Sequence, residues 1–192
     1  MSAHSIRRVT APRPAALVPA ALALAAASCG GMHGSTQTPG GQGPKVAHAV
    51  IEGRSGSHAS GNASFISTND GVRITVHITG ASPGMHAVHL HDKGDCSAPD
   101  ATSAGPHFNP TQHTHGSPQA DPHHAGDFGN MQVGPDSSGT LELVSRDLTV
   151  DPGPKCVVGH SIVVHGGTDD FTSQPAGNSG PRVGCGVVVA GP

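Results

Sequence analysis

Aromatic residues are almost absent from this sequence of 192 residues, which has four Phe and neither Trp nor Tyr. A hydrophobic core must therefore be built from Val, Ile, Leu and Ala, which favours short strands over large helices. Charged residues are also few, at 12%, and the formal net charge is −3. This balance gives no basic surface of the kind that binds nucleic acid or an anionic membrane face. Attraction for an anionic substrate would have to come from a local site.

Histidine, in contrast, is abundant, with 15 residues. Histidine at this level, in a chain with few other charges, suggests metal chemistry or proton handling. The alternative is a solvated, His-rich surface, and only the spacing of the histidines can decide between the two. The 28 Gly and 17 Pro indicate a chain rich in turns and loops.

The N-terminal region has the layout of a secretory signal. Three arginines among the first 13 residues precede the apolar run 15–27, which ends in small residues before Cys29. The run is too short to span a bilayer, and Leu24–Cys29 resembles a bacterial lipoprotein cleavage box. We predict a signal peptide at 1–28, lipidation of Cys29, and a flexible Gly-, Pro- and Ser-rich linker at 29–44. The chain is then exported to the periplasm or cell envelope, and the lipid is its one membrane contact.

Export makes a disulfide plausible among the cysteines that remain, Cys96, Cys156 and Cys185. Three thiols permit one bridge and one free Cys, and the residues alone leave the pair open. A Cys96–Cys185 bridge would close a loop of about 90 residues and stabilise the fold by roughly 4–5 kcal/mol in the loop-entropy model. Cys156 precedes an apolar run, which favours a buried, inert thiol.

From residue 45 onward the apolar residues alternate or cluster in short runs. The segment 72–78 alternates with a period of two, and Asn69-Asp70-Gly71 before it is a hairpin turn signal after a strand ending near Phe65. No window shows a helical stripe. A second hairpin is expected from strands at 130–133 and 140–144 with a turn at 134–139, and further strands are expected at 157–165 and 185–189. The pattern predicts an all-β antiparallel barrel or sandwich of about eight strands over 45–192.

Residues 92–125 carry no strand pattern, and a loop this long is usually functional. His89 and His91 lie two apart in the preceding strand-like run, so both imidazoles face one side, as in half of a copper or zinc site. Metal coordination would supply the cross-links that such a loop otherwise lacks. Further candidate ligands are His107, His113, His115, His123, His124, Asp127 and His165.

Four segments, in this order along the chain, resemble the copper/zinc superoxide dismutase family, and the resemblance covers essentially all of 45–192. They are the copper-strand signature at 84–91, the bridging-histidine segment at 103–110, the zinc-ligand segment at 124–130 and the C-terminal active-site region at 163–186. The resemblance implies a Greek-key barrel with long metal-binding and active-site loops.

The resemblance also implies the site residues. Copper, one per subunit, would be bound by His89, His91, His107 and His165, and zinc, one per subunit, by His107, His115, His124 and Asp127. The family's spacing selects His115 over His113 and His124 over His123. Asp169 would link His89 to His115, Arg182 would guide the anion, and Cys96 and Cys185 would form the disulfide. His107 and Arg182 would be the catalytic residues, whereas His86 is expected to anchor a loop.

The function implied is dismutation of superoxide to dioxygen and hydrogen peroxide at a redox-active copper bridged through His107 to a structural zinc, which would protect the cell envelope. A homodimer is an assembly that the family allows. The short interval from His91 to Cys96 argues against the familiar eukaryotic dimer contact. The alternatives are a non-enzymatic copper-binding domain, a metal-buffering lipoprotein and a copper-only dismutase. Each of them predicts that ligands or the arginine are missing or scattered, and none is missing here.

Overall fold

The computed structural model describes residues 45–192, which form nine strands and one short 3-10 helix, η1 (Thr102–Ala104). The strands are β1 (Val46–Gly53), β2 (Ser60–Thr68), β3 (Gly71–Thr79), β4 (Gly84–His91), β5 (Asp127–Val133), β6 (Ser138–Ser145), β7 (Ser161–His165), β8 (Arg182–Val187) and β9 (Val189–Ala190). No helix within this range is long and apolar enough to cross a membrane. The predicted signal peptide and linker, with Cys29, lie outside the described residues.

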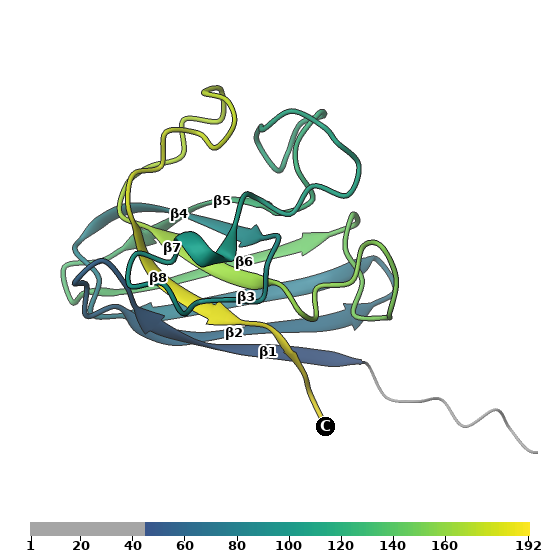
Figure 1. The fold of residues 1–192 in the computed structure, drawn as a ribbon, viewed down its shortest axis with the longest axis horizontal. Coiled ribbons are helices and arrows are strands. Elements are labelled where there is room, and N and C mark those ends of the chain that lie inside the picture. Colours follow the sequence, from purple (N-terminus) through teal and green to yellow (C-terminus); the bar gives the residue numbers. More distant parts are fainter. Residues whose placement is uncertain (1–44) are drawn as a thin grey trace, which may run out of the picture. The chain divides into compact units, whose positions relative to one another are not determined.

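The strands pair in the order β2-β3-β6-β5-β4-β7-β8-β1-β9, and β1 also pairs with β2. The sheet therefore closes on itself as a barrel of eight strands, with β9 added to β1 (Figure 1). Every ladder between strands is antiparallel. The chain crosses from β3 to β4 past two intervening strands, as a Greek key requires. The predicted all-β antiparallel fold is confirmed.

Strand β3 shows why this sequence forms the barrel. Val72, Ile74, Val76 and Ile78 point into the core and are at most 1% exposed, while the polar residues between them face outward. The turn signal before it joins β2 to β3, with Thr68 paired to Gly71 across the turn. The period-two pattern therefore fixed both the strand and its inward face.

Two elements differ from the sequence prediction. The hairpin expected between β5 and β6 is reduced to a single pair in the described barrel, Val133↔Gly139, because β6 pairs along its whole length with β3 instead. The strand expected at 157–165 begins only at Ser161, since Gly159, with φ +87°, turns the chain before it. Apolar runs identified these segments, but the identity of the partner strand depends on the closed topology.

The core is aliphatic, as the shortage of aromatic residues predicts. Its largest fully buried apolar side chains are Phe65, Ile51, Ile74, Ile78, Leu90, Met131 and Ile162. Two other aromatic residues, Phe108 and Phe128, reach the same core. The tight packing of β-branched side chains gives the barrel wall on which the buried histidines lie.

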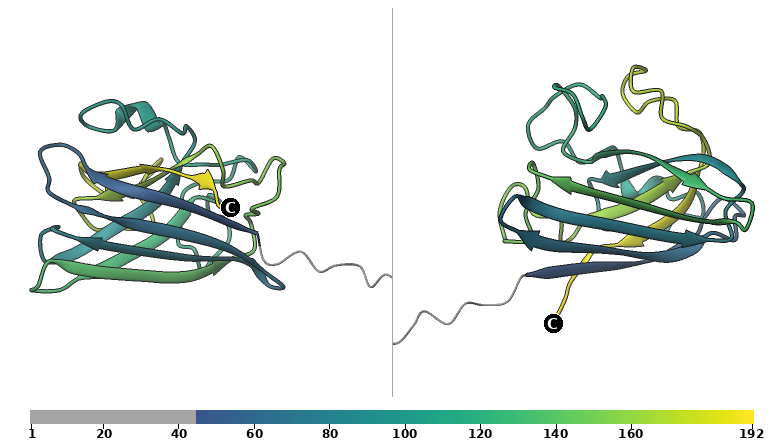
Figure 2. Two further views of the ribbon diagram at one scale, coloured as in Figure 1. Left: turned by 90° about the horizontal axis from the view of Figure 1, so that it is seen from below. Right: turned by 180° about the vertical axis from the view of Figure 1, so that it is seen from behind.

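Two long connections rise from the same side of the barrel: 92–126, between β4 and β5, and 166–181, between β7 and β8 (Figures 1 and 2). The first holds no strand, as expected, and only η1. The two connections touch, because the His115 backbone N–H donates to Gln174 Oε1 at 2.9 Å and Gln174 Nε2 donates to the His115 carbonyl at 2.9 Å. Candidate site residues are thus held between the barrel wall and two joined loops.

Candidate metal centre

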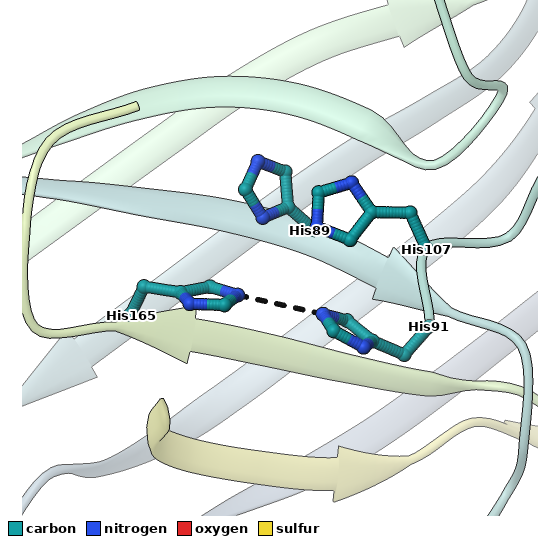
Figure 3. Close-up of side chains that lie close together, drawn as sticks. All are labelled: His89, His91, His107 and His165. Atoms are coloured by element: carbon teal, nitrogen blue, oxygen red, sulfur yellow. Dashed lines mark hydrogen bonds between the residues drawn. The ribbon is translucent and has the colours of Figure 1, made fainter. Parts of the chain in front are cut away.

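Three buried histidines on strands meet a fourth from the first long connection. His89 and His91 lie in β4, His165 ends the neighbouring strand β7, and His107 joins them through a backbone bridge with His91. One ring nitrogen from each of the four lies within 4.8 Å of the others. Figure 3 shows the imidazoles gathered over β4 and β7, with His91 Nε2 3.4 Å from His165 Nε2. We call these four residues the strand group.

A second group is built mostly from the long connection and is centred on a carboxylate. His107, His115, His124 and Asp127 again place one ligand atom each within 4.8 Å of the others. Asp127 Oδ1 lies 2.8 Å from His107 Nδ1 and 3.2 Å from His124 Nδ1, and Oδ2 lies 3.1 Å from His115 Nδ1. Asp127 Oδ2 also accepts from the backbone N–H of Gly116 and His124. We call these four residues the loop group.

His107 belongs to both groups, and its two ring nitrogens face different ways. Nδ1 donates to Asp127 Oδ1 in the loop group, while Nε2 has no hydrogen-bond partner. Its ring lies against that of His89, with centroids 3.9 Å apart and the planes tilted by 33°. A single imidazole therefore spans the two groups, one nitrogen to each.

The unpaired polar atoms test whether metal ions fit. Among the described residues, three buried side-chain nitrogens have no hydrogen-bond partner: His89 Nδ1, His107 Nε2 and His115 Nδ1. All three belong to the two groups, and an unpaired buried nitrogen is costly unless a cation or proton satisfies it. Four imidazoles suit copper, and three imidazoles with one carboxylate suit zinc. The donor sets therefore fit the two metals.

Asp169 connects the two groups by accepting a hydrogen bond from one histidine of each. Its Oδ2 accepts from His89 Nε2 at 2.8 Å and its Oδ1 from His115 Nε2 at 2.9 Å, and the carboxylate is fully buried. These bonds leave Nδ1 of each imidazole as the free ligand atom. Asn130 holds the Asp169 backbone at both ends, accepting from its N–H at 2.8 Å and donating to its carbonyl at 2.9 Å.

Burial keeps the strand group neutral. It lowers the pKa of His89, His91 and His165, and it lowers the pKa of His107 to about 4, although the hydrogen bond to Asp127 opposes the shift. At neutral pH these imidazoles carry no proton that a metal would have to displace from a charged ring.

The loop group has the opposite electrostatics. Burial lowers the pKa of His115, but the carboxylates of Asp127 and Asp169 on either side outweigh it and raise that pKa to about 9. Burial likewise disfavours ionised Asp127 and Asp169, yet the histidine contacts hold the pKa of both carboxyls well below their usual range. In the metal-free chain a protonated His115 therefore balances two buried negative charges.

A cavity of about 620 Å³ leads to His91, His107 and His165, and Arg182 forms part of its wall. Arg182 Nη1 donates to the Ala101 carbonyl at 2.7 Å, and Nη2 donates to the Gly105 carbonyl at 2.8 Å. Burial lowers the Arg182 pKa from its ordinary value, but a guanidinium remains charged in proteins. A fixed cation thus stands in a largely apolar cavity, beside the strand group.

Comparisons with known proteins agree with this geometry. The sequence profile described as "Copper/zinc superoxide dismutase (SODC)" matches residues 59–188. The chain belongs to the copper/zinc superoxide dismutase family. One similar solved structure is the clock protein EA4, at 34% identity, with a TM-score of 0.69 and coverage of 77% of this chain and 96% of that chain. Another is a double mutant of a SOD-like protein from Bacillus subtilis, at 33% identity, with a TM-score of 0.66 and coverage of 74% and 96%.

This superoxide dismutase family member has a disulfide close to the cavity. Cys96 and Cys185 are joined, with Cα atoms 5.8 Å apart, and they pack with Ala101 and Ala104 of the η1 segment. The bridge therefore ties the segment around η1, whose carbonyls accept from the Arg182 guanidinium, to strand β8. Cys156 lies outside the disulfide. The prediction of a buried thiol is wrong, because Cys156 lies at an exposed turn before Val157 and is half-buried.

Two histidines named as alternatives stay outside the groups. His113 is exposed, and its backbone is tied to Asn109. His123 is half-buried against Asp121 and Asp147 rather than against Asp127. His86 is a loop anchor whose two ring nitrogens face carbonyl oxygens: Nδ1 lies 2.6 Å from that of His165, and Nε2 lies 2.8 Å from that of Ser82.

Sequence reasoning missed the residues that hold Asp169 and the candidate ligand His115 through their backbone. Asn130 and Gln174 are amide side chains that clamp Asp169 and His115, and Gly177 packs against both of the latter residues. None belongs to a ligand pattern. Asn130 alone had a signal, because it stands in the segment that resembles the family's zinc-ligand region.

Proposed function

We propose that this chain is an active superoxide dismutase that converts two superoxide ions and two protons to dioxygen and hydrogen peroxide. The observation that carries the proposal is His107, whose Nδ1 lies in a zinc-type group and whose unpaired Nε2 lies in a copper-type group. An imidazole shared in this way requires two cations close together. A metal-buffering protein has no need of such a bridge.

The residues of the cavity would bring the substrate to the strand group. Copper bound by the strand group would supply one-electron oxidation and reduction, and zinc bound by the loop group would supply a fixed positive charge that does not change oxidation state. Arg182 would attract and orient superoxide, because its guanidinium is held by two carbonyls and faces an apolar cavity.

His107 would manage one proton of the reaction. Its Nε2 faces the strand group and has no competing protein partner, so a proton held there can pass to reduced oxygen in the cavity. Asp127 orients the ring through Nδ1, and solvent would supply the second proton. The chain would thereby couple proton delivery to the site of electron transfer.

The place of action is part of the proposal. A signal peptide at 1–28 and a lipidated Cys29 would export the chain and anchor it in the cell envelope, where it would remove superoxide. A homodimer remains a proposal too, and the short interval from His91 to Cys96 favours a contact different from the eukaryotic one.

The test is to purify the chain, load it with copper and zinc, count both metals per chain and assay superoxide removal. We expect one of each metal and rapid removal, with His165→Ala losing at least about 1000-fold of the rate. The matched control is His113→Ala, an exposed histidine outside both groups, which should keep full activity. Correct metal content without activity in the wild type would reject the enzyme and leave a metal-binding protein.

A further inference from the structure

The carboxylate of Asp169 is closed in by its own loop, which returns to it at Gly177. The Asp170 N–H donates to the Gly177 carbonyl at 3.0 Å, and the Gly177 N–H donates to the Ser173 carbonyl at 2.7 Å. Gly177 is buried, and its Cα hydrogens face the bond between Asp169 and His115. The residue thus covers the contact through which Asp169 reaches the loop group.

No side chain can be placed at this position without displacing that contact. A Cβ on Gly177 would overlap Asp169 Oδ1 and would lie 2.6 Å from both Asp169 Cγ and His115 Nε2. Gly177 also has φ +66°, a backbone conformation that favours glycine. Two separate requirements, space and backbone conformation, therefore meet at one residue.

Asp169 has no room to move aside. Its Oδ2 is held by His89 Nε2, and its Oδ1 accepts from the Phe171 N–H at 2.8 Å as well as from His115 Nε2. Asn130 fixes its backbone. A Cβ at 177 would have to break the Oδ1 contacts, and His115 Nε2 would lose its acceptor.

Gly180, three residues further along, separates the two requirements. Its φ is +75°, so an alanine there meets the same backbone strain. A Cβ at Gly180 would find only the backbone of Gly167, at 3.5 Å, which is ordinary contact. Gly180→Ala is therefore a control for the strain alone.

We propose that Gly177 is a positioning residue for the metal centre, which acts through Asp169 by leaving the space in which that carboxylate joins His89 to His115. The assignment rests on the proposed two-metal function for its consequence, which is zinc affinity. The contacts of Gly177 with Asp169 and His115 exist in the metal-free chain as well. Gly177 touches no substrate and no ligand atom that would face a metal.

The experiment is a double-mutant cycle of Gly177→Ala and Asp169→Ala, with Gly180→Ala as control. Zinc affinity is measured by competition with a chelator, and the unfolding temperature Tm is measured on the metal-free chain. We expect Gly177→Ala to weaken zinc binding about 10- to 100-fold, the usual cost of disturbing a ligand's hydrogen-bond partner. Gly180→Ala should stay within about threefold of the wild type.

The cycle isolates the mechanism because Asp169→Ala removes the carboxylate that the new Cβ would strike and frees His115 Nε2, the other close atom, from the bond that holds it there. In that background Gly177→Ala should weaken zinc binding by no more than Gly180→Ala does, and it should lower Tm by a similarly small amount. If Gly177→Ala alone does not fold, the double variant should recover a folded, cooperative transition. An undiminished loss in the Asp169→Ala background, or failure to recover folding there, would overturn the inference.

The wild-type control separates this inference from the proposed function. If the wild-type chain binds no zinc, the proposed function fails, whereas the Tm cycle on the metal-free chain still reads the Gly177–Asp169 coupling. If zinc binds and the chain shows no dismutase activity, zinc affinity remains a valid measure. Equal Tm values and equal zinc affinities for wild type and Gly177→Ala would reject the positioning role.

Discussion

The strand group and the loop group share His107, but their geometries have different origins. All four strand-group histidines are fixed by backbone pairing: three lie in the β4 and β7 ladders, and His107 forms a backbone bridge with His91. In the loop group, His115 and His124 lie in a connection without strands and are held by side-chain contacts to Asp127, Asp169 and Gln174. A barrel can therefore position one metal site before metal arrives, while the other depends on buried charges.

The charges sharpen the same contrast. The strand-group imidazoles have lowered pKa values and are neutral, whereas His115 in the loop group has a raised pKa and lies between two carboxylates. Neutral rings pack as ordinary buried groups once their second nitrogen is hydrogen-bonded. A buried charge cluster requires every member, because removal of one leaves the others uncompensated. The loop group should therefore be the more fragile of the two.

Removal of Asp127 should have the largest effect on this comparison. Asp127→Ala removes the carboxylate that lies within 3.2 Å of three loop-group histidines and accepts from two backbone N–H groups. We expect the free energy of unfolding of the metal-free chain to fall by about 3 kcal/mol and zinc affinity to fall by at least about 100-fold. Urea denaturation and chelator competition measure the two effects. Asp70→Ala, in the exposed β2–β3 turn, should change neither, and an equal change there would contradict the argument.

Zinc removal should loosen the loop group and spare the barrel. The Gly116 and His124 amides donate to Asp127 Oδ2. Their exchange with solvent deuterium should be at least about 10-fold slower in the zinc-loaded protein than after chelation. The amide of Val76 in the β2–β3–β6 region should exchange at the same rate in both states. Hydrogen exchange followed by NMR reads all three amides. A uniform change across the barrel would remove the distinction between the groups.

Arg182 lines the cavity that leads to the strand group, and two backbone carbonyls fix its guanidinium there. Arg182→Gln should lower the second-order rate of superoxide removal about 10-fold and reduce its dependence on salt, because a local cation raises the anion concentration at the cavity. Pulse radiolysis or stopped-flow assays at two ionic strengths measure both quantities. Arg73→Gln, on the outer face of β3, makes the same change in net charge and should leave the rate within twofold.

The smallest expected effect is a proton count. Because the pKa of His115 is raised to about 9, this residue is protonated at pH 7 in the metal-free chain, and zinc must displace the proton. Zinc binding should thus release about one proton at pH 7, and zinc affinity should rise with pH until about pH 9. Copper binding to His89, His91 and His165, whose pKa values are lowered, should release none from those rings. Calorimetry in two buffers of different ionisation enthalpy distinguishes these outcomes.

The sequence predicted those features of the fold and of the site that depend on local residue patterns. Alternating apolar residues located β3 and the β2–β3 hairpin, and the family motifs named the seven ligand positions that the structure gathers into two groups. The same patterns could not give the partner of β6, because pairing with β3 rather than β5 depends on closure of the barrel. Strand existence is local information, and strand neighbours are not.

The missed residues show the same limit at the site. Gln174 reaches His115 across 59 positions and Asn130 reaches Asp169 across 39, so no spacing rule connects them. Gly177 is one of 28 glycines, and only the position of the Asp169 carboxylate distinguishes it. Candidate ligands can be recognised in a sequence by their residue type, whereas the residues that hold ligands in place are recognised only in the folded structure.

The single pair between β5 and β6 has a consequence for the fate of metal-free chains. Along the rest of their length these two neighbouring strands share no ladder pair in the described barrel, so its ladder is weakest at this place. Residues 118–121 and His123 of the first long connection line a cavity of about 340 Å³ together with Asp127 of β5 and the end of β6. The connection that carries the loop group therefore lies beside a junction where two neighbouring strands share a single ladder pair, and we expect zinc removal to leave that junction less covered.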